Sequence, residues 1–165
     1  MRLHNAVAEK VSESKMYEYK CELDRVVDGD TVDVDIDLGF GIWLRKERVR
    51  VMGIDTPESR TSDPIEKIFG KAASARLKEL IEHDCILCTT KDRSGEDERG
   101  KFGRVLGDFK LADGRMVTDV LIGERHAVGY HGGSKNDMVE QHMANRKFLI
   151  AGGIVTLPVD NDDGA

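Results

Sequence analysis

The strongest constraint on the fold is a strictly alternating run, V-D-V-D-I-D-L, at residues 32–38. A repeat of two residues is typical of a strand that buries one face, because successive side chains point to opposite sides. Turn signals bracket the run, D-G-D at 28–30 and G-F-G at 39–41, so it must pair with neighbouring strands through short connections. The alternation predicts an inward row of aliphatic side chains and an outward, solvent-facing row of Asp33, Asp35 and Asp37.

The rest of the chain predicts a mixture of strands and helices. Gly70 weakens the first turn of a helix expected over 63–82, which could therefore start near Lys71. Further helices are expected at 116–122 and 137–149, and further strands at 17–27, 42–54, 85–91 and 104–111. This order predicts a small α+β domain with a curled, barrel-like sheet. We expect a flexible arm at 1–16, one domain at 17–152 and a disordered tail at 153–165.

Composition excludes several classes of protein. With 165 residues the chain suits a single domain. No apolar run approaches the roughly 18 residues that span a bilayer, and the N-terminal residues lack the apolar stretch of a secretory signal, so we expect a cytoplasmic protein. Three cysteines cannot form a paired framework, and we expect Cys21, Cys85 and Cys88 to be reduced, structural thiols.

Two segments bring together residue types suited to phosphate chemistry. One is the turn that contains Asp30, and the other is the segment 48–58, in which Arg50 lies on a strand and Asp55 and Glu58 flank a Thr-Pro pair. Carboxylate oxygens suit a hard cation such as Ca²⁺ or Mg²⁺. The planar guanidinium of arginine suits phosphate oxygens. The residues alone leave open whether these acids are ligands or only turn formers.

Three sequence blocks, taken together, are similar to one known family. They are V-V-D-G-D-T-V at 26–32, R-V-R-V-M-G-I-D-T-P-E at 48–58 and K-F-G-R at 101–104. Their order resembles the pattern of the staphylococcal nuclease-like (thermonuclease) family, and the similarity extends from about Tyr17 to Phe148. Two departures are Phe102, where the family has tyrosine, and Gly100, where it usually has an acid.

The resemblance implies a fold, an activity and a set of site residues. The fold would be a five-stranded OB barrel with three helices, and the activity Ca²⁺-dependent hydrolysis of DNA and RNA that leaves 3′-phosphate ends. Mg²⁺ or Mn²⁺ could replace Ca²⁺. Asp30, Asp55 and the carbonyl of Thr56 would hold the metal; Arg50 and Arg104 would bind the scissile phosphate; Glu58 would be the general base; Lys101 and Tyr130 would contact substrate.

Several alternatives remain open at this level. The same barrel could bind nucleic acid or a protein without cutting, or, given a formal charge of −6, act as a DNA mimic. The basic residues Arg45, Lys46 and Arg48 fit either a guard on an edge strand or part of a nucleic-acid path. We expect His126, His131 and His142 to have surface or packing roles, and the protein to be a monomer.

Overall fold

The computed structural model describes residues 16–90, 98–130 and 134–159. The expectations for the N-terminal arm, for His131 and for the last residues of the tail therefore lie outside the described residues, except at Met16, which begins the first strand.

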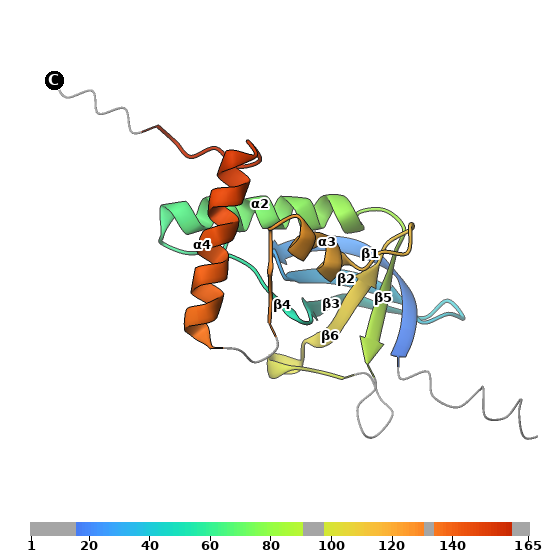
Figure 1. Ribbon diagram of the computed structural model, residues 1–165. Coiled ribbons are helices and arrows are strands. Elements are labelled where there is room, and N and C mark those ends of the chain that lie inside the picture. The colour runs from blue at the N-terminus through green and yellow to red at the C-terminus, as the bar shows by residue number, and fades with distance from the viewer. Residues whose placement is uncertain (1–15, 91–97, 131–133, 160–165) are drawn as a thin grey trace, which may run out of the picture.

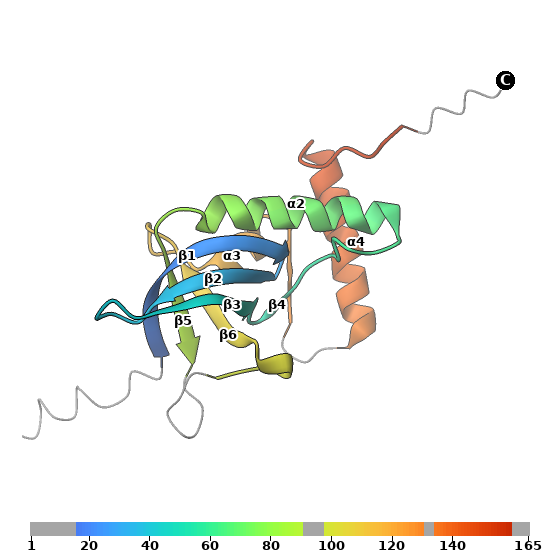
Figure 2. The same cartoon turned by 180° about the vertical axis from the view of Figure 1, so that it is seen from behind.

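A closed barrel of five strands forms the centre of the molecule (Figures 1 and 2). The strand order around the barrel is β1-β2-β3-β6-β5, with β5 pairing back onto β1. All neighbours are antiparallel except β3 and β6, which run parallel over a short stretch. This arrangement confirms the expected α+β OB-type barrel. Its strands are β1 (Met16–Asp28), β2 (Thr31–Asp37), β3 (Trp43–Val51), β5 (Cys85–Thr90) and β6 (Val105–Lys110).

The remaining elements surround the barrel. A small second sheet pairs β4 (Ile54–Asp55) with β7 (Val128–Gly129). Three α-helices lie in the described part of the chain, as expected: α2 (Pro64–Ile81), α3 (Val117–Gly123) and α4 (Lys135–Ala151). Figure 1 shows α2 running across the top of the barrel and α4 standing to one side of it.

The alternating run becomes β2, and its aliphatic row points into the barrel except at Leu38, which lies beyond the end of β2 and is 40% exposed. Val32, Val34 and Ile36 are almost completely buried there, together with Val49 of β3 and Phe109 of β6. The three cysteines are free thiols, all buried among the strands.

The aspartate row of β2 corrects one expectation. Asp33 is not solvent-facing, because only 7% of its side chain is exposed. The long side chains of Arg25 and Arg48 cover it from the two neighbouring strands and form ion pairs with it. Sequence alternation alone cannot show this, because it distinguishes the two faces of a strand but not what covers the outer one.

Helix α2 begins at Pro64, before Gly70 rather than after it. Asp63 caps the helix by accepting hydrogen bonds from the first free backbone N–H groups, and proline at the first position leaves no donor unsatisfied. Its apolar face buries Leu77 in the barrel core and Phe69 in a separate cluster beside it. Gly70 is buried on that face, so its lack of a side chain serves close packing and not a helix start.

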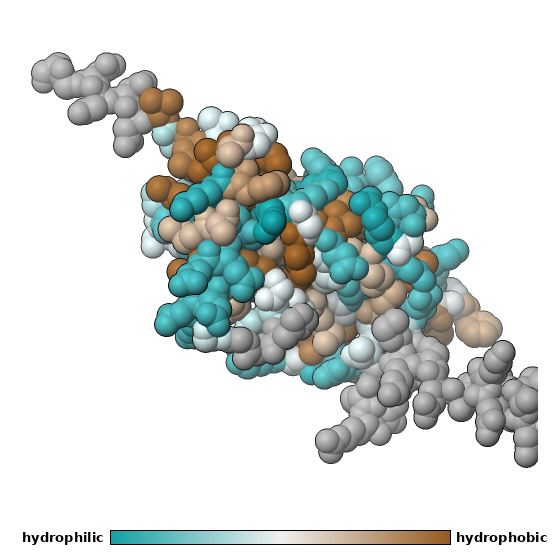
Figure 3. All heavy atoms as spheres, viewed as in Figure 1, coloured by the Kyte–Doolittle hydropathy of each residue, from teal (hydrophilic) through white to brown (hydrophobic). Residues whose placement is uncertain are grey.

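Helix α4 packs on the domain through one face only. Leu149 packs with Val155 and with Phe69 of α2 in a small second core. The packed chain therefore extends beyond residue 152, into the segment expected to be a disordered tail. Hydrophobic residues gather around the C-terminal end of α4 in Figure 3, and Phe148 and Ile154 are about half exposed there. In the described ranges, no helix combines the length and apolarity needed to cross a bilayer.

Candidate functional site

An open cavity of about 880 Å³ lies where the β1–β2 turn, β3, the segment after β4 and the turn before β6 meet. Both segments singled out in the sequence contribute to it, although they are far apart in the chain. Of the expected site residues, the cavity is lined by Asp30, Arg50, Asp55, Glu58 and Arg104.

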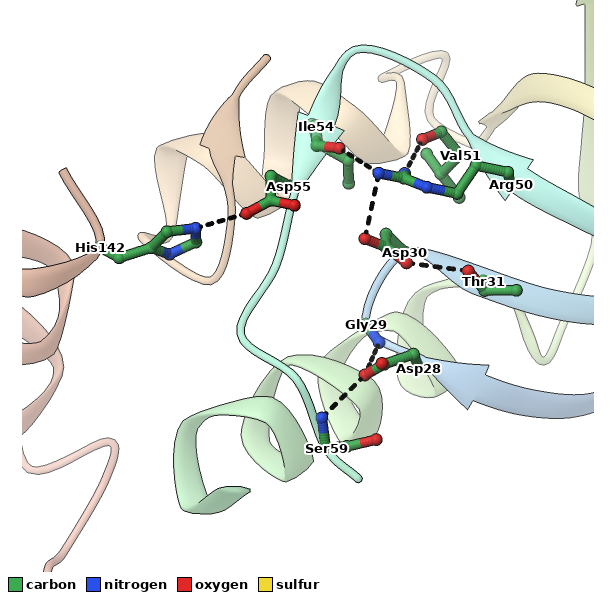
Figure 4. Close-up of polar contacts among 10 residues, drawn as sticks. All are labelled: Asp28, Gly29, Asp30, Thr31, Arg50, Val51, Ile54, Asp55, Ser59 and His142. Carbon is green, nitrogen blue, oxygen red and sulfur yellow. Dashed lines mark hydrogen bonds and ion pairs between the residues drawn. The ribbon is translucent and has the colours of Figure 1, made fainter. Parts of the chain in front are cut away.

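Asp30 lies in the tight turn between β1 and β2. Its Oδ1 accepts a hydrogen bond of 2.8 Å from the hydroxyl of Thr31, and its Oδ2 lies 3.3 Å from Nη2 of Arg50 (Figure 4). Burial raises the pKa of Asp30 above its usual range, and the negative charges of Asp28 and Asp55 add to this effect. The carboxylate is thus largely buried, and the ion pair with Arg50 compensates its negative charge only in part.

Arg50 reaches the cavity from β3. Its neighbours Val49 and Val51 point into the core, so the strand directs the guanidinium outward. The guanidinium donates to the backbone carbonyl oxygens of Val51 and Ile54, in addition to its ion pair with Asp30 (Figure 4). These contacts fix its orientation at the cavity wall.

Asp55 ends the short strand β4 and touches helix α4. Its Oδ2 lies 2.7 Å from Nε2 of His142 (Figure 4). Sequence reasoning had given His142 a surface or packing role. The contact joins residues 87 positions apart in the chain, and no local pattern could have revealed it.

Glu58 lies beyond the Thr-Pro pair and faces three other carboxylates. Partial burial is the main cause that raises its pKa to about 7, followed by a hydrogen bond with Asp28 and the charges of Asp28, Asp30 and Asp55. Four acidic side chains therefore act on one another in this part of the cavity.

Sequence patterns did not identify Asp28 as a site residue. Its Oδ1 accepts from the backbone N–H groups of Gly29 and Ser59, which ties the β1–β2 turn to the segment carrying Glu58 (Figure 4). The D-G-D motif itself was the available signal, since the turn places both of its acids beside the same cavity.

Arg104 reaches the cavity from the turn before β6. It follows a short 3₁₀ helix, η1 (Lys101–Gly103), and its Nε donates to the carbonyl oxygen of Lys101. Arg99 holds this turn by donating to the carbonyl oxygen of Gly103 and pairing with Glu47 of β3. The side chains of Arg50 and Arg104 thus line the same cavity.

Three expected site residues do not line this cavity. Thr56 is buried, and its hydroxyl oxygen has no hydrogen-bond partner. Lys101 is exposed, and its carbonyl oxygen accepts from Arg104. Tyr130 is 45% exposed and donates its backbone N–H to the carbonyl oxygen of Gly53.

The donor set of the cavity suits a hard divalent cation. The clustered carboxylates repel one another, and this repulsion helps to raise the pKa values of Asp30 and Glu58. A divalent cation among them would relieve the repulsion. In the part of the chain that is described, however, no three His, Cys, Asp or Glu side chains are already placed around one point as ligands. The chemistry of the residues fits calcium, and backbone carbonyls or water would complete its ligands.

Comparison with known proteins finds similarity over the part of the chain that carries most of these residues. The family model described as staphylococcal nuclease homologue matches residues 48–148. That range includes Arg50, Asp55, Glu58 and Arg104, whereas Asp30 lies before it.

Three similar proteins carry nuclease names. The chain is 34% identical over 102 residues to endonuclease YncB of Bacillus subtilis, covering 62% of this chain and 44% of that protein. It is 33% identical over 102 residues to the SPbeta prophage-derived endonuclease YokF of Bacillus subtilis, covering 62% and 31%. It is 37% identical over 90 residues to the thermonuclease of Staphylococcus intermedius, covering 54% and 47%. The chain thus matches less than half the length of each relative.

Proposed function

Because this chain belongs to the family of staphylococcal nuclease homologues, we propose that it is a nuclease that hydrolyses phosphodiester bonds of DNA and RNA with Ca²⁺. We further propose little sequence preference, 3′-phosphate products and a monomeric enzyme. The names of the relatives, two endonucleases and a thermonuclease, support the reaction class.

One observation carries the proposal. A single cavity brings a cluster of four carboxylates together with the side chains of Arg50 and Arg104. Phosphodiester hydrolysis needs both kinds of group, since a dianionic transition state must be stabilised and a water must lose a proton. The cluster consists of Glu58 and the three acids whose charges act on it, Asp28, Asp30 and Asp55, whereas Asp33 and Glu47 line another part of the cavity.

Each residue has a proposed role. Asp30, Asp55 and the carbonyl of Thr56 would hold the metal, which would supply positive charge to stabilise the phosphate. Arg50 and Arg104 bind the scissile phosphate, and their planar forks donate to its non-bridging oxygens. Glu58 accepts the proton of the attacking water. Lys101 and Tyr130 would contact the substrate strand outside the cavity, where Tyr130 offers a ring for base stacking.

The test is a degradation assay with single-stranded DNA and with RNA. We expect cleavage in calcium, loss of cleavage with chelator and recovery when calcium is restored. Glu58→Gln should abolish cleavage while calcium binding, measured by calorimetry, persists. Magnesium and manganese, tested in parallel, show whether they replace calcium. Binding of the oligonucleotide without cleavage in any divalent ion would instead support a nucleic-acid-binding module.

A further inference from the structure

A row of charged side chains lies on the outer barrel surface beside the candidate active site. Strand register places Arg25 of β1 opposite Asp33 of β2, and Asp33 opposite Arg48 of β3. The same register places Thr31 opposite Arg50. Because residues two apart on a strand share a face, the two rows are successive rows of one surface.

The buried carboxylate of Asp33 holds both arginines of this row. Its Oδ2 lies 2.7 Å from Nε of Arg25, and its Oδ1 lies 2.8 Å from Nε of Arg48. A further hydrogen bond of 3.0 Å joins Nη2 of Arg48 to Oδ2. The hydrogen bonds from Arg48 and Arg25 hold the pKa of Asp33 below its usual range, so it stays ionised at neutral pH. We call these three residues the arginine row.

The arginine row carries a net positive charge that its internal ion pairs do not neutralise. One carboxylate faces two guanidiniums, and the side chains of Arg25 and Arg48 remain 58% and 43% exposed. Arg25 uses only Nε in its contact, so its terminal N–H groups can donate to a ligand. Both arginines line the cavity that contains Arg50. Their orientation is fixed before a ligand arrives, which lowers the entropic cost of binding it.

We propose that the arginine row binds a backbone phosphate of the nucleic-acid strand, next to the phosphate held by Arg50 and Arg104. This inference rests on the proposed nuclease function and adds a second phosphate subsite to it. Arg48 and Arg50 are two residues apart on β3, which separates their backbones by roughly 6.6 Å. That separation suits groups that contact consecutive phosphates of one strand.

The neighbouring basic residue Arg45 lies outside the cavity. It pairs with Asp35, lies over the ring of Trp43 and does not line the cavity. Arg45 therefore provides a control on the same strand. If Arg48 only prevented another strand from pairing at a sheet edge, its replacement would not change the affinity for nucleic acid.

The test compares two variants of equal charge change. Arg25→Gln, Asp33→Asn and Arg48→Gln are combined in one protein, so that no buried carboxylate is left without its partners. Arg45→Gln is the control, and each protein loses one net positive charge. Circular dichroism and thermal unfolding check that both fold. Binding of a fluorescent single-stranded oligodeoxythymidine is measured by anisotropy in calcium, with Glu58→Gln added to each protein to prevent cleavage.

We expect the triple variant to bind the oligonucleotide about 10-fold more weakly than the control. The slope of log affinity against log salt should fall by about 0.7, the value for one phosphate contact on a single strand. With Glu58 intact, kcat/KM for the oligonucleotide should fall about 10-fold relative to that for a dinucleoside monophosphate, which has no flanking phosphate.

Equal affinity and equal salt slope in the two variants would overturn the subsite, and so would an unchanged ratio of the two kcat/KM values. If the unmodified protein cleaves neither substrate, the nuclease function fails on its own. The anisotropy experiment still decides the subsite in that case, because it requires binding and not cleavage.

Discussion

Replacement of Gly70 by alanine should damage the candidate active site more than it damages the fold. A Cβ atom at Gly70 would lie 2.5 Å from the backbone carbonyl carbon and oxygen of Glu58 and from the backbone nitrogen of Ser59. Ordinary contact begins near 3.4 Å, so α2 and the segment carrying Glu58 must separate by about 0.9 Å. Backbone atoms cannot rotate out of the way as a side chain end can.

A displacement of about 1 Å in a catalytic group can cost about 10²-fold in rate. We therefore expect Gly70→Ala to lower kcat/KM for oligonucleotide cleavage by about 10²-fold. The effect on stability should be smaller, because alanine gains about 1 kcal/mol of helix propensity against about 1–3 kcal/mol of overpacking.

The assay is cleavage of a fluorogenic oligonucleotide in calcium, with thermal unfolding measured on the same samples. The matched control is Gly123→Ala at the end of α3, where an added Cβ meets nothing within 4 Å. Full activity of the folded Gly70→Ala protein would refute the reasoning, because it would show that the position of Glu58 does not depend on this contact.

Three further predictions concern charge. Arg50→Lys should reduce kcat/KM for cleavage by about 10²-fold or more, because an ammonium group cannot replace the planar guanidinium. Two backbone carbonyls and Asp30 hold that guanidinium in place. A loss below about 10-fold would contradict this. Burial lowers the pKa of His126 below 6.5, so the unfolded chain binds more protons at this residue just below that pH. As the pH is lowered there, the contribution of His126 should reduce the free energy of unfolding by up to about 1.4 kcal/mol per pH unit. Because the raised pKa of Glu58 acts in the opposite sense in the same pH range, the test is the difference between the unmodified protein and His126→Gln in urea unfolding; equal dependence on pH in both would exclude His126 as a contributor. Cleavage should slow steeply as salt rises from low to physiological, given a formal charge of −6, and a flat rate would count against phosphate binding by a few local cations.

Much of the fold could be predicted because its patterns are local. The alternation at 32–38, the N-cap of α2 and the turn residues around β2 each depend on neighbours in sequence, so strands and helices fall close to their expected positions. Gly70 was misjudged for the same reason. Helix propensity is a local property, whereas the reason for glycine is the backbone of Glu58, which reaches Gly70 only in the folded chain.

The sequence by itself determined which residue types are available for a phosphate and metal site, since the motif acids and arginines appear in order along the chain. Tertiary structure decided which charges meet. It buried Asp33 between Arg25 and Arg48, and brought His142 against Asp55. The physical reason is that burial and pairing depend on side chains from strands and helices distant in sequence, whose closeness is created only when the barrel closes and α4 packs beside it.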